Sequence, residues 1–179
     1  ADFEPQTIVR GLPTIGAEWS YPLARSEGGV HQVLEPIVQL ISSPNVGNTV
    51  EIPNEDSLSF EFDDTNLFSE DRFAGLDRWE TGTRANVGLR YSVYTPSGAQ
   101  ANALFGQSYR LEENTSVAAE TGLRDETSDY VGRIMVSPSN NLLAVYRFRI
   151  DDERFKIRRN EVNLLGRHGP VSAELGYGY

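Results

Sequence analysis

The carboxylates whose spacing could support chemistry lie in one stretch, between Phe60 and Arg78. They are Asp63, Asp64, Glu70 and Asp71. A pair of carboxylates can act as acid and base in glycoside hydrolysis, and several carboxylate oxygens can bind Ca²⁺. The spacing of an EF-hand loop, with its Gly and terminal Glu, is absent. Nothing in the sequence positions a catalytic pair, so we expect no catalytic residue, no metal site, no cofactor and no enzymatic activity.

The same stretch is too apolar for a solvated linker, because disordered segments contain few large apolar side chains. Its large apolar residues are Phe60, Phe62, Leu67, Phe68 and Phe73. We therefore expect an ordered loop that packs against the rest of the protein, with Arg72 and Arg78 paired to Asp63, Asp64 or Asp77. A cap whose aromatic side chains merely bury themselves is the alternative.

Composition excludes several classes of protein. The chain has 179 residues and a formal net charge of −10, which argues against a nucleic-acid partner. It has no Cys, so disulfides and thiolate sites are excluded within it. His31 and His168 are far apart and predict no metal site or triad. The chain begins at Ala1 rather than Met, and we expect it to be a mature or excised piece of a longer protein.

Alternation of apolar and polar residues with a period of two predicts about eight antiparallel strands of about 9–12 residues. The predicted strands are Thr14–Leu23, His31–Ser42, Thr83–Tyr94, Ala99–Leu111, Tyr130–Ser137, Leu142–Ile150, Phe155–Leu165 and Val171–Tyr179. This length matches a tilted membrane-spanning strand better than the shorter strands of soluble sheets. The connections after the first, third, fifth and seventh predicted strands are short, those after the second and fourth are long, and the one after the sixth is short but acidic. Short turns on one side and longer loops on the other are typical of outer-membrane barrels.

One face of the predicted strands is aliphatic and aromatic, and the other carries arginines that we expect to face a polar lumen. The lumen-facing candidates are Arg84, Arg90, Arg110, Arg147, Arg149 and Arg158. They could meet phosphate or sugar groups, but pairing with acidic lumen side chains is the favoured interpretation. The sequence thus predicts an all-β, up-and-down transmembrane β-barrel segment within one domain, residues 1–179, with a long loop at about 43–80.

Three stretches then suggest a family. They are His31–Pro36, the motif Leu67-Phe68 followed by Asp71–Arg78, and Thr83–Tyr91, and Ala103–Tyr109 fits as well. Together they resemble the barrel domain of the LptD family, also called the OstA or organic-solvent-tolerance family. The sequences of Asn54–Asp56 and Asp63–Asn66 resemble those of the alphaproteobacterial branch of this family. Many relatives carry Asn where this chain has Asp71.

The resemblance implies a barrel of about 26 strands in the outer membrane of a Gram-negative bacterium. It implies transport of lipopolysaccharide without covalent chemistry, as part of the translocon that assembles this lipid into the outer leaflet. Implied partners are lipopolysaccharide, outer-membrane lipid, an LptE-like lipoprotein plug and a periplasmic LptA-like bridge. The loop motif would then shape the exit path or the plug contact through Asp63, Asp64, Leu67, Phe68, Asp71, Arg72, Phe73, Gly75, Asp77 and Arg78. We expect the long loops outside the cell and the turns near Pro96, Pro138 and His168 in the periplasm.

Two other interpretations stay open. A soluble β-sandwich or barrel that binds carbohydrate would pack its apolar faces inward. A hydrolase that uses the acidic loop would lose its activity when Asp63 or Asp64 is replaced.

Overall fold

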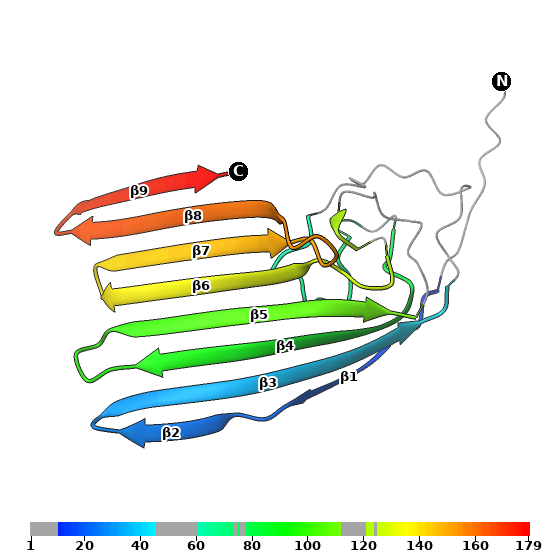
Figure 1. Ribbon diagram of the computed structural model, residues 1–179, viewed down its shortest axis with the longest axis horizontal. Coiled ribbons are helices and arrows are strands. Elements are labelled where there is room, and N and C mark those ends of the chain that lie inside the picture. Colours follow the sequence, from blue (N-terminus) through cyan, green and yellow to red (C-terminus); the bar gives the residue numbers. More distant parts are fainter. Residues whose placement is uncertain (1–10, 46–60, 74, 76–77, 112–120, 124) are drawn as a thin grey trace.

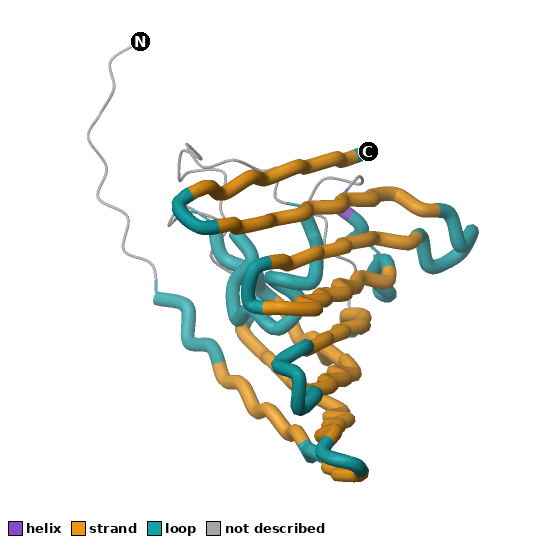
Figure 2. The backbone as a smooth tube through the Cα atoms, turned by 90° about the vertical axis from the view of Figure 1, so that its left-hand side faces the viewer, coloured by secondary structure: helices purple, strands orange, loops and turns teal. Residues whose placement is uncertain are grey.

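A single antiparallel sheet of nine strands forms the part of the chain that the computed structural model describes, which is residues 11–45, 61–73, 75, 78–111, 121–123 and 125–179. The strands are β1 (Ile15–Ser20), β2 (Leu23–Glu27), β3 (Val30–Ser43), β4 (Gly82–Tyr94), β5 (Gln100–Arg110), β6 (Tyr130–Ser139), β7 (Leu142–Ile150), β8 (Ile157–His168) and β9 (Val171–Gly178). From β3 to β9 each strand pairs with the next in sequence (Figure 1). The predicted all-β, up-and-down architecture is confirmed. The sheet twists and is not closed, and β1, β2 and β9 form its edges (Figure 2).

The predicted first strand is interrupted. Both β1 and β2 pair with β3 in one register, and the two strands are separated only by Tyr21 and Pro22. The Tyr21 N–H still donates to the Pro36 carbonyl at 3.2 Å, but Pro36 has no N–H to donate in return, which explains the interruption. The strand predicted from Phe155 starts at Ile157 instead. Before it, residues 151–156 form a tight turn in which the Phe155 N–H donates to the Asp151 carbonyl and Phe155 has a φ of 52°.

The two faces of the sheet differ as the alternation predicted. On β3, Leu40 is 55% exposed, whereas its neighbour Ile41 is 1% exposed. The same contrast continues along β4, where Leu89 is 44% exposed and Asn86 is fully buried. We call the exposed apolar side the outer face, and the side that residues 61–73 cover the loop face. The soluble alternative required apolar faces packed inward, and on this point it is wrong.

Connections of two kinds lie at opposite ends of the strands. Tight turns join β2 to β3, β4 to β5, β6 to β7 and β8 to β9 at one end (Figure 1). The connections after β3, β5 and β7 lie at the other end, and the first of them contributes residues 61–80 to the loop face. At this end the connections after β3 and β5 are long and the one after β7 is short, as the sequence predicted.

The hydrophobic core lies between this loop and the sheet. It consists of Phe62, Leu67 and Phe73 from the loop with Leu123 and Val131, and Phe68 packs at its margin. The described residues include no helix with the length and hydropathy needed to cross a membrane. Within the described residues, the organised interior is therefore the contact between the acidic loop and the arginine-rich face.

Candidate functional site

The loop has a compact local structure that its own polar side chains make. The Asn66 side chain donates to the Glu61 carbonyl (2.8 Å) and accepts from the Asp63 N–H (3.0 Å). The Asp63 carboxylate in turn accepts the Thr65 N–H at 2.8 Å. Short Asn and Asp side chains that bond nearby backbone groups are typical of turns. This turn points Phe62 and Leu67 together toward the sheet.

Two glycines make room for the apolar part of the loop. Gly88 of β4 and Gly106 of β5 lie directly opposite one another, and both are buried on the loop face. A Cβ at Gly106 would meet the Leu67 side chain and would lie 2.5 Å from the Val87 carbonyl oxygen. A Cβ at Gly88 would lie 2.7 Å from the Phe68 ring. Leu67 and Phe68 thus sit on bare backbone, a close approach that only glycine permits.

Arg72 ties the loop to itself and to the sheet. Its guanidinium donates to the carbonyls of Asn66 (3.0 Å) and Leu67 (2.8 Å), and it lies 5.1 Å from the centre of the Phe62 ring. It also donates to the side chains of Asn86 on β4 (2.9 Å) and of Glu80 (2.9 Å). The Arg72 side chain therefore donates hydrogen bonds to buried acceptors of both the loop and the sheet.

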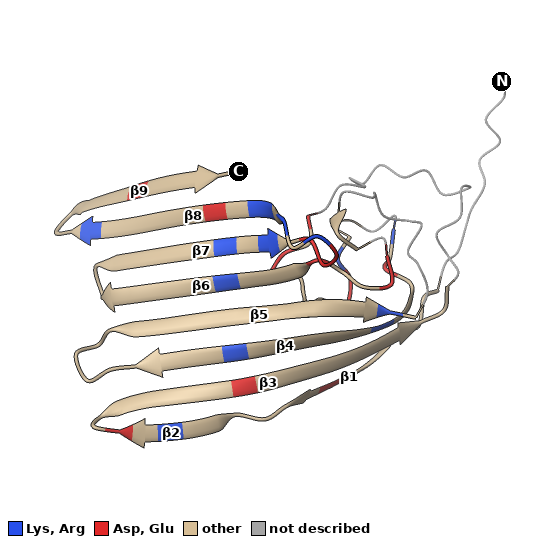
Figure 3. Cartoon of the chain, viewed as in Figure 1, with Lys and Arg blue, Asp and Glu red and all other residues tan. Residues whose placement is uncertain are grey.

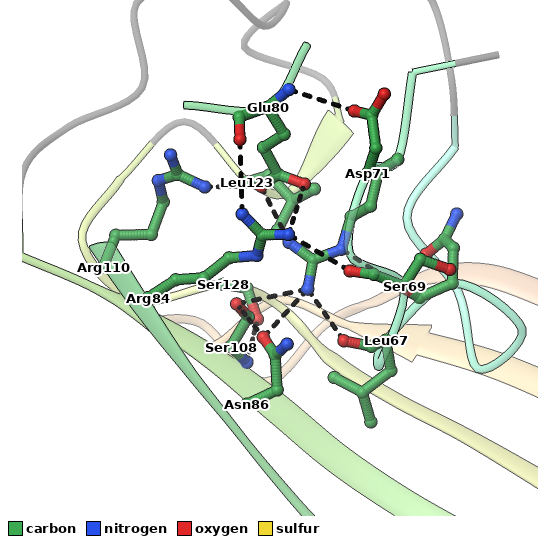
Figure 4. A network of polar contacts seen from close by, with 12 residues as sticks. Leu67, Ser69, Asp71, Glu80, Arg84, Asn86, Ser108, Arg110, Leu123 and Ser128 are labelled. Atoms are coloured by element: carbon green, nitrogen blue, oxygen red, sulfur yellow. Dashed lines mark hydrogen bonds and ion pairs between the residues drawn. The ribbon is translucent and has the colours of Figure 1, made fainter. Parts of the chain in front are cut away.

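Glu80 is the centre of the polar network, and its side chain is fully buried (Figure 4). Its carboxylate faces Arg72 at 2.9 Å, Arg84 at 3.6 Å and Arg110, which donates to the same oxygen as Arg72. Arg84 also donates to the carbonyls of Ser69 (3.1 Å) and Glu70. The guanidiniums thereby cap loop carbonyls that would otherwise be buried without a partner.

Asn86 and Ser108 extend the network across the sheet. The Ser108 hydroxyl donates to the Asn86 side-chain oxygen at 2.6 Å, and the Asn86 amide donates to Gln39 of β3 at 2.7 Å. Gln39 donates in turn to the Phe68 carbonyl at 2.9 Å. The polar chain therefore crosses β5, β4 and β3 and returns to the loop.

A second group of ion pairs holds the tip of the loop. Asp64 lies 3.2 Å from Arg133 and 3.3 Å from Arg147, and its side chain is fully buried. Glu61 lies 2.8 Å from Arg159 and 4.0 Å from Arg149, while Asp63 lies 3.4 Å from Arg159. Most basic residues of β4 to β8 lie toward the strand ends that carry the loops (Figure 3).

Burial is the largest cause of the pKa shifts of three charged side chains in the loop, Asp64, Asp71 and Arg72. It raises the pKa of the Asp64 carboxyl above its ordinary value, although Arg133 and Arg147 oppose the shift. Burial also raises the pKa of Asp71, against the N–H groups of Glu80 and Phe73 that its carboxylate accepts. It lowers the pKa of the Arg72 guanidinium, which Glu80 opposes. These charges are poorly solvated, so each depends on its partners.

The predicted pairing of Arg72 with Asp63 or Asp64 was wrong. Its carboxylate partner is Glu80, whereas Asp63 and Asp64 pair with arginines of the sheet. The Arg72 guanidinium donates to the carbonyls of Asn66 and Leu67, and these hydrogen bonds hold it away from the carboxylates of Asp63 and Asp64. Gly75 and Arg78 are half-buried, and Asp77 lies outside the described residues.

The predicted arginines of the strands pair with acidic side chains, as the favoured interpretation stated. Arg90 lies 2.7 Å from Glu35, Arg149 lies 3.4 Å from Asp129, and Arg84, Arg110 and Arg147 pair with loop carboxylates. Arg158 differs, because it falls in an irregularity between β7 and β8 and pairs with Asp151. The neighbouring residue Arg159, rather than Arg158, lies on the loop face, where it pairs with Glu61 and Asp63.

The sequence reasoning missed Glu80 and Asn86. Glu80 follows the motif by two residues and precedes β4, and its importance arises only when three arginines converge on it. Among the described residues, no group of three or more His, Cys, Asp or Glu could hold a metal ion. Asp63 and Asp64 are both engaged with arginines, which does not favour the hydrolase interpretation.

Comparison with known proteins agrees with this architecture. The family model described as "LPS transport system D", LptD, matches residues 2–179. The chain belongs to the LptD family. The LPS-assembly protein LptD of Aeromonas hydrophila is 35% identical over 95 residues, which are 51% of this chain and 12% of that protein. The part of that LptD protein matched here is thus a small fraction of its length.

Proposed function

We propose that this chain is part of the wall of an outer-membrane β-barrel that assembles lipopolysaccharide into the outer leaflet. In this proposal the outer face meets lipid and the loop face lines the lumen. The observation that carries it is the inversion of the sheet, whose apolar side chains are exposed while Glu80 and its arginines are buried. A large membrane barrel has this arrangement, with an apolar outside and a polar interior.

The sheet itself supports a larger assembly. Its edge strands β1 and β9 each pair on one side only. Unpaired backbone groups are not tolerated in hydrocarbon, so strands from elsewhere in the full-length protein must pair with both edges. The same full-length protein would contact an LptE-like lipoprotein plug in the lumen and a periplasmic LptA-like bridge.

The loop motif narrows the lumen in this proposal. Residues 61–73 cover the loop face of β4 to β7 at the end of the strands opposite the tight turns. Because the core and the Glu80 network hold the loop to the wall, it would shape the exit path and the surface that the plug meets. This role includes Gly75 and Arg78 and, outside the described residues, Asp77.

Depletion of the full-length protein tests the proposed transport. We expect lipopolysaccharide to stop reaching the cell surface, because depletion removes the barrel through which the lipid would reach the outer leaflet. Surface lipopolysaccharide can be followed with a membrane-impermeant probe after depletion, and a plasmid copy of the full-length gene serves as the control. Unchanged surface lipopolysaccharide in depleted cells would contradict the proposal.

Cysteine labelling tests the orientation of the strands. Ser97 lies exposed in the turn between β4 and β5, and Asp125 lies exposed in the connection between β5 and β6, at the other end. In intact cells we expect a membrane-impermeant maleimide to label Asp125→Cys and to spare Ser97→Cys. Both should react after the outer membrane is permeabilised. Labelling of Ser97→Cys from outside intact cells would reverse the proposed orientation.

A further inference from the structure

Three pairs of arginines face each other directly across neighbouring strands. The strand register places Arg84 opposite Arg110 on β4 and β5, Arg133 opposite Arg147 on β6 and β7, and Arg149 opposite Arg159 on β7 and β8. Like charges in directly opposed positions destabilise a sheet. Three such pairs on one face therefore require negative charge from outside the strands.

The same loop supplies a carboxylate to each pair. Glu80 lies between Arg84 and Arg110, Asp64 between Arg133 and Arg147, and Glu61 between Arg149 and Arg159. At Arg149 and Arg159 the carboxylates of Asp63, Asp129 and Glu161 add further negative charge. At Glu80 a third guanidinium, that of Arg72, shares the one carboxylate in a fully buried site. At the middle pair, the described residues place Asp64 alone within ion-pair distance of Arg133 and Arg147.

Asp64 is a poor fit for this middle pair. In the described part of the chain neither of its oxygens makes a hydrogen bond, whereas at the Glu80 site only one of the two carboxylate oxygens is left without one. The Nε atoms of Arg133 and Arg147 make none either, and this holds for Arg84, Arg110 and Arg149 as well. One carboxylate also leaves two guanidiniums with an excess positive charge. A phosphate monoester carries about −1.5 to −2 charges and three acceptor oxygens, and guanidinium forks match its geometry.

The middle pair is the most exposed of the three. The side chains of Arg133 and Arg147 are 24% and 29% exposed, against 0% and 5% for Arg84 and Arg110 and 9% and 18% for Arg149 and Arg159. A cavity of about 270 Å³ lies nearer the tight turns, lined among others by Asn102, Met135 and Leu143, and Asn102 connects it to the pair. Asn102 lies 3.4 Å from the Arg133 guanidinium. An anionic group with an apolar body could therefore approach the pair along this cavity.

We propose that the three arginine pairs are an anion-binding ladder that the loop carboxylates occupy at rest, and that a phosphate group of the transported glycolipid displaces Asp64 from Arg133 and Arg147. The loop thus acts as a built-in competitor that holds the ladder until a stronger anion arrives. Only the identity of the ligand rests on the proposed function, because the ladder itself follows from the strand register.

Photo-crosslinking in the full-length protein tests the displacement. A benzoylphenylalanine at Met135, purified with the plug lipoprotein, should crosslink to intact lipopolysaccharide several-fold more strongly when Asp64→Asn is introduced. Glu35→Gln is the matched control, since it removes one carboxylate from the same face without touching the loop. The gain should vanish with dephosphorylated lipopolysaccharide and with Arg133→Gln plus Arg147→Gln. A gain of equal size for the dephosphorylated lipid, or no gain, would overturn the proposal.

A second measurement needs no substitution. Hydrogen exchange of residues 61–67 in the native full-length protein should accelerate in inorganic tripolyphosphate relative to sodium chloride of the same ionic strength. Equal exchange in the two salts would overturn the ladder. Acceleration by tripolyphosphate without any crosslink to lipopolysaccharide in any variant would support the ladder and overturn lipopolysaccharide as its ligand. Failure of the proposed function is read separately, from surface lipopolysaccharide in depleted cells.

Discussion

Replacing Glu80 by Gln in the full-length protein will lower the free energy that holds the loop on the sheet by about 3–5 kcal/mol. The substitution keeps the shape of the side chain and removes its charge. Arg72, Arg84 and Arg110 then face one another in a buried site without their shared carboxylate. Breaking a buried ion pair on one side is costly because the remaining charge is buried and uncompensated. Native-state hydrogen exchange of residues 62–73 measures this opening free energy directly.

The control is Glu35→Gln, which also removes a carboxylate from an arginine on the loop face. Glu35 and Arg90 are 20% and 42% exposed, so this change should cost only about 0–1 kcal/mol. Adding Arg110→Gln to Glu80→Gln should restore part of the lost protection, because it removes one of the unpaired charges. Equal effects of Glu80→Gln and Glu35→Gln would show that the buried network does not hold the loop.

The strands were predictable because period-two alternation is a local property. Leu40 and Ile41 are adjacent and both apolar, yet the pattern around them assigns them correctly to opposite faces. The interruption between β1 and β2 was also visible in principle, since Pro36, which has no N–H, was placed inside the predicted strand His31–Ser42. The alternation alone did not show that the predicted first strand would form two separate strands, β1 and β2, which both pair with β3.

The cross-strand pairing of arginines could have been predicted from the sequence for two of the three pairs. Arg84 and Arg110 are equidistant from Ser97, the centre of a recognisable turn, and Arg133 and Arg147 are equidistant from Asn140. A hairpin fixes its cross-strand partners through its turn. The path of the loop could not be found in this way. No local periodicity states that Asp64 reaches β6 and β7 while Arg72 turns back to Glu80, because those contacts depend on how Phe62, Leu67 and Phe73 bury themselves.

Leu89→Arg in the full-length protein will reduce the amount of folded barrel in the outer membrane, with a cost of about 2–4 kcal/mol if Leu89 faces the middle of the bilayer. Leu89 lies near the centre of β4, opposite Pro36 on β3 and Phe105 on β5. Leu89 and Phe105 are 44% and 46% exposed, so an arginine there has no protein group to shield it from lipid. The folded fraction can be measured by heat-modifiable migration of outer-membrane extracts.

The matched control is Asn163→Arg, at a central position of β8 on the opposite face. An arginine at Asn163 would face the polar lumen, so folding should change little. If the two variants fold equally well, the outer face does not meet lipid and the inversion of the sheet needs another explanation. If only Leu89→Arg fails, exposure of the apolar side chains is a property of the assembled barrel, and the arginine ladder lies on its inner wall. The same pair of variants therefore decides which face of the sheet a transported lipid can reach.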